Sequence, residues 1–136
     1  MNVTIIDGQG GQLGAQLVRE ISAQFDDINI TAIGTNSVAT ATMLKAGAKN
    51  AATGENSVIV ACRKADVIIG PLGIVICDAL LGEITEKMAA AVGRADAVRI
   101  LIPVNKCDNL VAGVSTNSTK ILIDDAIAKL RSIIEG

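Results

Sequence analysis

The sequence predicts an α/β fold, a three-layer Rossmann-like sandwich with a mostly parallel sheet and an antiparallel edge strand. Apolar runs of strand length alternate with helix-period segments along all 136 residues, which is typical of βαβ units. Half of the residues are hydrophobic, but Phe25 is the one aromatic residue. The core must therefore consist of Val, Ile, Leu and Ala, as in strands buried on both faces. Residues 1–136 are expected to form one domain.

The apolar pattern places the individual elements. Runs rich in β-branched residues and bounded by turn residues predict strands at 3–6, 28–33, 50–53, 66–69 and 98–104. Apolar residues at helical spacing predict helices at 13–25, 37–46, 74–81, 85–93 and 123–134. Ser37 and Thr85 are the expected N-caps of two of these helices.

Two further segments need a separate interpretation. Residues 55–64 suit a crossover helix, but the run Val58-Ile59-Val60 suits a strand equally well. Residues 110–114 follow the strand at 98–104 too closely for a helical crossover, so they are predicted to pair antiparallel at a sheet edge. In the usual strand order 3-2-1-4-5, the first and fourth strands are neighbours, and their glycine loops would face each other across one crevice.

The most informative motif follows the first strand. Gly8-Gln9-Gly10-Gly11-Gln12-Leu13-Gly14 stands between a buried strand and an amphipathic helix, the context that makes a glycine motif a phosphate-site hypothesis. Its glycines allow a tight turn and a close approach of the backbone to a ligand. The free N–H groups at the start of the helix would face an anion. Gly11 is expected where the backbone meets the phosphate.

The predicted ligand site gathers the polar and glycine-rich segments that follow the strands, because ligands of such sheets bind beyond the carboxyl ends of the strands. Its residues are Gly8, Gln9, Gly10, Gly11, Gln12, Leu13, Thr35, Asn36, Gly70, Pro71, Leu72, Gly73, Asn105 and Lys106. A purely structural origin stays open, since strands must end in turns and turns favour Gly, Pro, Asn and Asp.

The pattern indicates a nucleotide or dinucleotide, without identifying it. NAD or NADP is a candidate cofactor, but Thr35 and Asn36 occupy the region where an acid usually binds the ribose. A smaller nucleotide or another phosphorylated ligand therefore stays open. No Gly-Lys-Ser/Thr follows the loop, which argues against nucleoside triphosphatase chemistry. No Trp or Tyr is present to stack on a flavin.

No catalytic residue is assigned from the sequence. The chain has neither tyrosine nor histidine, so it lacks the Tyr-x-x-x-Lys relay of short-chain reductases and the commonest general base. The remaining titratable candidates are Asp7, Glu55, Asp78, Glu83, Lys106 and Cys107. For each of them a structural role is at least as good an interpretation.

Composition excludes several other functions. The formal charge is −2 and there is no basic run, which argues against nucleic-acid binding. No segment suggests a membrane span or a signal peptide, so the expected location is the cytoplasm. Three widely spaced cysteines and no histidine argue against disulfides and against a metal site.

Self-association is expected in either case. The segment 74–81 and the last helix carry more apolar residues than one sheet face requires, and an excess of this kind usually marks an interface. A two-fold homodimer is the first choice. The alternative to nucleotide binding is a structural or interaction module that oligomerises and binds no nucleotide.

Several segments together resemble a known family. They are Ile6-Asp7-Gly8-Gln9-Gly10-Gly11, Gly34-Thr35-Asn36, Thr53-Gly54-Glu55-Asn56, Gly70-Pro71-Leu72-Gly73-Ile74, Leu81-Gly82-Glu83-Ile84-Thr85 and Pro103-Val104-Asn105-Lys106-Cys107. This combination is similar to that of small bacterial proteins catalogued as a domain of unknown function. The resemblance implies a Rossmann-like single domain, and it implies no catalytic role for any residue.

Overall fold

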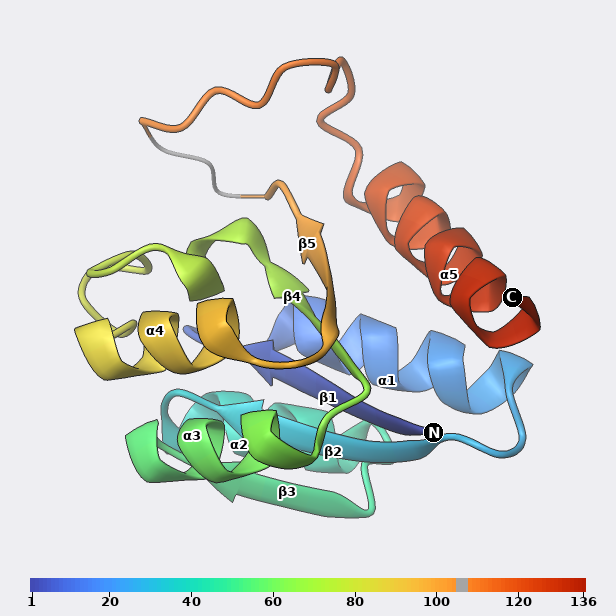
Figure 1. Cartoon of the computed structure of the whole chain (residues 1–136), viewed down its shortest axis with the longest axis horizontal. Helices are drawn as coiled ribbons and strands as arrows, with labels where there is room; N and C mark the ends of the chain where they lie inside the picture. The colour runs from blue at the N-terminus through green and yellow to red at the C-terminus, as the bar shows by residue number, and fades with distance from the viewer. Residues whose placement is uncertain (105–107) are drawn as a thin grey trace.

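A five-stranded parallel sheet with helices on both faces forms the protein (Figure 1). The computed structural model describes residues 1–104 and 108–136. The strands are β1 (Asn2–Asp7), β2 (Asn29–Gly34), β3 (Asn50–Thr53), β4 (Val67–Pro71) and β5 (Val98–Ile102). The helices are α1 (Gln12–Gln24), α2 (Ser37–Lys45), α3 (Glu55–Lys64), the 3₁₀ turn η1 (Leu72–Val75), α4 (Glu86–Arg94) and α5 (Thr119–Glu135). This is the Rossmann-like α/β fold that the sequence predicts.

The strand order is β3-β2-β1-β4-β5, as predicted. β1 lies at the centre, with Val3 in register with Ile30 of β2 and with Val67 of β4. Because these three strands are parallel, their carboxyl ends meet at one edge of the sheet. The chain builds β2 and β3 on one side of β1 and then crosses to β4 on the other side, so the strand order reverses between β1 and β4.

Two apolar cores lie on the two faces of the sheet, because neighbouring strand residues point to opposite faces. Ile5 belongs to the core beneath α1, α2 and α5, which Leu17, Met43 and Leu130 complete. Ile6 belongs to the core beneath α3 and α4. All five residues of β4 are buried. Aliphatic side chains thus fill both layers, as the composition indicates.

Segment 55–64 is a helix, which resolves the choice that the sequence leaves open. Val58, Ala61 and Cys62 are buried at helical spacing on one face of α3, so the period of the core contacts outweighs the β propensity of the Val58-Ile59-Val60 run.

The antiparallel edge strand at 110–114 is not found. This segment contains a turn, in which the Val114 N–H donates to the Val111 carbonyl at 3.3 Å and Gly113 has a φ of +84°. Leu110 is 95% exposed. Turn geometry outweighs strand pairing here, and every strand pair in the part of the chain that the structure describes is parallel.

The helix expected at 74–81 is also wrong. After η1, Asp78, Leu80 and Leu81 have φ values of +66°, +56° and +55°, which a right-handed helix excludes.

Of the two predicted N-caps, Ser37 is wrong by one residue, since the Asn36 side chain accepts the Ala39 N–H. The Thr85 cap is confirmed, because its side chain accepts the Met88 N–H.

Within residues 1–104 and 108–136, we find no helix with the length and apolar character that crossing a bilayer requires.

Candidate functional site

Three of the loops that the sequence assigns to the ligand site follow β1, β2 and β4. β1 leads into the glycine loop, which we define as residues 8–11, and β2 leads into Thr35 and Asn36. β4 leads into η1 and then into the left-handed segment, which we define as residues 76–83. Because the strands are parallel, these three loops lie at the same end of the sheet, beyond the carboxyl ends of the strands.

Asp7, the last residue of β1, holds the glycine loop against α1. Its buried carboxylate accepts the Gly8 N–H through Oδ1 and the Gly14 N–H through Oδ2, both at 2.8 Å. Burial raises the pKa of Asp7, with the negative charge of Glu83 adding to the rise, while the two N–H groups act to lower it. Asp7 therefore satisfies one of the free amides at the start of α1 from inside the protein.

Most glycines of the loop are explained by packing. Gly11 has a φ of +76°, and a Cβ at this position would lie 2.7 Å from the Ala39 backbone of α2. A Cβ at Gly8 would lie 2.7 Å from Thr35 Oγ1. Gly10 differs, because a Cβ there would have no neighbour within 4 Å. Among the glycines of this loop, Gly10 is thus the one at which a side chain would extend into open space.

A pocket of about 210 Å³ lies at this loop. It is lined by residues 7–13 together with Pro71, Leu80 and Val104. Among the described residues, no group accepts a hydrogen bond from the N–H groups of Gly10, Gln12 or Leu13. These amides surround the N-terminus of α1, where the helix dipole favours a negative charge.

Glu83 links the loops that follow β1 and β2. Its Oε1 accepts the Gln9 N–H at 2.9 Å, the Thr35 hydroxyl at 2.7 Å and the Asn36 amide at 2.7 Å. Its Oε2 has no hydrogen-bond partner among residues 1–104 and 108–136. Burial acts to raise the pKa of Glu83, but the three hydrogen bonds outweigh it and hold the pKa below its usual range.

A strained backbone brings Glu83 to this place. Three non-glycine residues of the left-handed segment, Asp78, Leu80 and Leu81, have positive φ, which costs about 1–2 kcal/mol each. Two backbone hydrogen bonds close the segment: Asp78 N–H to the Ile84 carbonyl at 2.7 Å, and Ile84 N–H to the Ala79 carbonyl at 3.2 Å. Strained residues of this kind cluster at functional sites.

The predicted site residues fall into four groups. Gly8, Gln9, Gly10, Gly11, Gln12, Leu13 and Pro71 line the pocket at α1. Thr35 and Asn36 gather at Glu83. Leu72 and Gly73 line a neighbouring pocket of about 310 Å³, and Gly70 lies inside β4 against the Ile6 carbonyl. Asn105 and Lys106 lie outside the described residues.

Sequence reasoning did not predict that Glu83 links the loops after β1 and β2, or that Leu80 lines the pocket at α1. Glu83 stands beside a Leu-Leu-Gly run that resembles an apolar helix face, and its hydrogen-bond partners are 47 to 74 residues away. No local signal could have found these contacts. The position of Asp7 at the end of a buried strand is the one signal that was available for the loop.

The other titratable candidates have different surroundings. Glu55 accepts the Thr85 hydroxyl at 2.6 Å, which links the starts of α3 and α4. Burial raises the pKa of Cys62 to about 11, so this thiol is unreactive at neutral pH. Cys107 lies outside the described residues. No group of metal-binding side chains occurs in the part of the chain that the structure describes.

Comparison with known proteins identifies the family. No curated protein matches the chain in sequence. Among solved structures, the chain is similar to the crystal structure of a dodecameric FMN-dependent UbiX-like decarboxylase from Escherichia coli O157:H7, with 16% identity and a TM-score of 0.49 over 95% of this chain and 76% of that chain. Residues 2–135 match the family model described as a domain of unknown function, DUF3842. The chain therefore belongs to the DUF3842 family.

Proposed function

We propose that this protein is a cytoplasmic nucleotide- or dinucleotide-binding protein, with the ligand phosphate at the N-terminus of α1. The observation that carries the proposal is the set of amides of Gly10, Gln12 and Leu13 at the pocket beside Gly10, which donate to no residue among 1–104 and 108–136. A phosphate accepts hydrogen bonds from such amides and is favoured by the helix dipole. A volume of about 210 Å³ suits the phosphate end of a ligand, not a whole dinucleotide.

The carboxylate of Glu83 is the group that we expect to bind a ribose beside that phosphate. The sequence lacks an acid at the end of β2, but the structure supplies a carboxylate at Thr35 and Asn36 from the left-handed segment. Its Oε2 is available to accept hydrogen bonds from a ribose diol. Because the lowered pKa keeps Glu83 charged at neutral pH, it would repel a 2′-phosphate. The proposal therefore favours NAD-type ligands and nucleoside diphosphates over NADP.

The described pocket lining contains no basic side chain, and Asp7 adds a carboxylate. Affinity for the phosphate would therefore come from amides and the helix dipole. The expectation that Lys106 meets the phosphate stays a prediction.

A thermal-shift and calorimetry panel of NAD, NADP, ADP, ATP and coenzyme A tests the proposal. Stabilisation of about 2.7 kcal/mol is expected for a ligand at 100 times its Kd, with NAD or ADP ahead of NADP. The matched variants are Gly10→Asp and Gly10→Asn, which add side chains of equal size into open space. We expect Gly10→Asp to lose binding of the anionic ligand more completely than Gly10→Asn, with both unliganded variants melting alike.

The second candidate function is an interaction module that binds no nucleotide. The packing contacts of Gly8 and Gly11 favour it, because they explain both glycines without a ligand. A flat response of the wild-type protein to the whole panel at millimolar ligand would contradict the first function and favour the second. Equal losses in the two Gly10 variants would show that bulk, and not charge, matters at the pocket.

A further inference from the structure

The open edge of the sheet at β5 differs from the edge at β3. β3 has four residues, Asn50–Thr53, with a polar residue at each end, which is how natural proteins protect an edge from pairing. β5 reads Val-Arg-Ile-Leu-Ile, and Val98 is 51% exposed. Arg99 does not protect this edge, because its guanidinium donates to the Ala95 carbonyl at 2.9 Å, at the end of α4.

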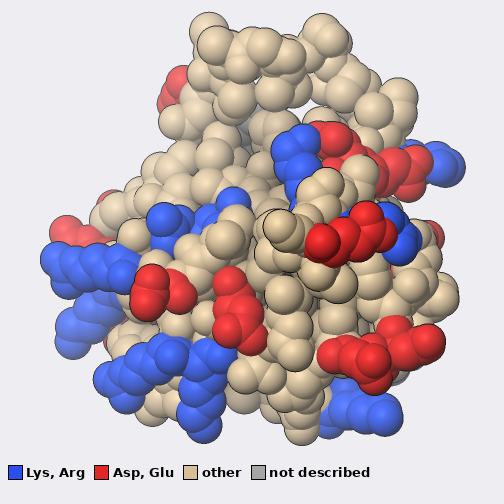
Figure 2. All heavy atoms as spheres, turned by 45° about the vertical axis from the view of Figure 1, so that its right-hand side comes forward, with Lys and Arg blue, Asp and Glu red and all other residues tan. Residues whose placement is uncertain are grey.

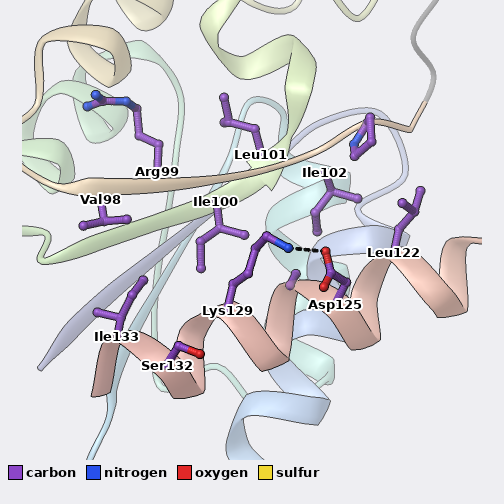
Figure 3. A pocket seen from close by; sticks show the side chains of 12 residues that line it. Val98, Arg99, Ile100, Leu101, Ile102, Leu122, Asp125, Lys129, Ser132 and Ile133 are labelled. Carbon is purple, nitrogen blue, oxygen red and sulfur yellow. Dashed lines mark hydrogen bonds and ion pairs between the residues drawn. The ribbon is translucent and has the colours of Figure 1, made fainter. Parts of the chain in front are cut away.

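A groove of about 420 Å³ runs along this edge between β5 and α5 (Figure 3). Ile100 and Ile102 point toward α5, whereas Arg99 and Leu101 point to the opposite face. On the helical wall, Lys129 and Asp125 form an ion pair one turn apart, and their side chains are 60% and 61% exposed. The groove is thus apolar at its floor and carries one charge of each sign on its wall.

The hydrogen-bonding groups of the edge are known from the pairing with β4. The Val98 N–H donates to the Asp66 carbonyl at 3.1 Å, toward β4. Since the backbone groups of alternate residues point to the same side of a strand, those of Arg99 and Leu101 point to the open edge. Neither N–H donates a hydrogen bond to a described residue outside the sheet.

We propose that this groove is occupied by a second copy of the chain, with β5 antiparallel to the partner's β5 around a two-fold axis at Ile100. Arg99 would then face the partner's Leu101, and these two residues would exchange both backbone hydrogen bonds. No like charges meet in this register. The sheet would continue through the axis into the partner, which removes both unprotected edges.

Charge complementarity on α5 favours a second copy over an unrelated partner. Two α5 helices related by the same two-fold axis run antiparallel beside the joined strands. Lys129 of each helix then faces the partner's Asp125 near the axis, so two ion pairs form between the helices. Figure 2, turned so that α5 comes forward, shows acidic and basic side chains interspersed on this face and not segregated. The Lys129–Asp125 pair makes this part of the surface self-complementary under the two-fold axis, as an isologous interface requires.

Light scattering and analytical ultracentrifugation of the whole chain test the proposal with charge variants. The wild type at micromolar concentration is expected at twice the single-chain mass of 13.9 kDa. Asp125→Lys gives each helix two positive charges here and Lys129→Glu gives each two negative charges, so each variant alone is expected to shift toward monomer. An equal mixture of the two is expected to restore the dimer as a heterodimer. Both positions are exposed, so neither variant endangers the fold, and each breaks the same intrahelical pair.

One control variant and one hydrogen-exchange measurement locate the contact. Leu81→Asp changes an exposed apolar residue outside the groove and is expected to remain dimeric. The N–H groups of Arg99 and Leu101 are expected to exchange more slowly with solvent in the wild type than in Lys129→Glu. A monomeric wild type, a mixture that stays monomeric, or unchanged exchange at Arg99 and Leu101 would overturn the proposal.

Discussion

At the scale of single residues, Glu83 unites the candidate site. One carboxylate oxygen receives donors from the loop after β1 and from the loop after β2, while the residue itself follows β4. Hydrogen bonds to a charged acceptor are stronger than those between neutral groups. The charge of Glu83 therefore contributes to stability as well as to the proposed ribose contact.

We predict that Glu83→Gln lowers the free energy of unfolding by about 1 kcal/mol at neutral pH. The effect is no larger because solvent weakens the hydrogen bonds of a partly exposed carboxylate. Because the folded state lowers the pKa of Glu83, its stabilisation is complete above the unfolded-state pKa and is lost as pH falls through the folded-state pKa. The difference between wild type and variant should therefore disappear in acid.

Urea denaturation of both proteins from neutral to acid pH measures this difference. Glu135→Gln, at the exposed end of α5, is the matched control and should leave the curve of stability against pH nearly unchanged. A difference between wild type and Glu83→Gln that stays constant into acid would show that the carboxylate charge makes no contribution.

At the scale of elements, the left-handed segment holds three of the four non-glycine residues with positive φ in the part of the chain that the structure describes. Leu81 combines a φ of +55° with 96% exposure, so its side chain gains almost no burial in return for the strain. Replacement by glycine should relieve about 1–2 kcal/mol of strain against about 0.5–1 kcal/mol of unfolded-state entropy. We predict that Leu81→Gly is more stable than the wild type by roughly 0.5–1 kcal/mol.

The matched control for this prediction is Leu44→Gly. Leu44 is 48% exposed but lies in α2 with helical backbone, where glycine costs about 1 kcal/mol. Thermal and urea unfolding should thus show opposite signs for the two leucine-to-glycine changes. A loss of stability in Leu81→Gly would mean that the left-handed conformation carries no strain at this residue.

The sequence predicts the regular elements better than the segment that shapes the site. The five parallel strands and α1 follow from apolar period and turn residues, which act locally. Residues 74–81 have the same apolar content, yet Asp78, Leu80 and Leu81 take positive φ because hydrogen bonds to Ala79 and Ile84 close the segment. Contacts of this kind outweigh propensity, and a local pattern does not reveal them.

At the scale of the whole molecule, the sheet order was predictable because crossovers are right-handed and short. The placement of the glycine loop was equally predictable. The meaning of its glycines was not, since the contact of Gly11 with Ala39 depends on how α2 packs against α1. The sequence alone does not distinguish a glycine that packing requires from a glycine that a ligand requires.

The long-range links of Glu83 also have a consequence for the order of events in folding. Its three hydrogen bonds connect residues 74, 48 and 47 positions apart, so they form only after β1, β2 and β4 have come together. Interactions absent from the transition state govern the rate of unfolding and not that of folding. In stopped-flow measurements, Glu83→Gln should therefore accelerate unfolding and leave the refolding rate unchanged. A slower refolding rate instead would place this junction of three loops among the first parts of the molecule to assemble.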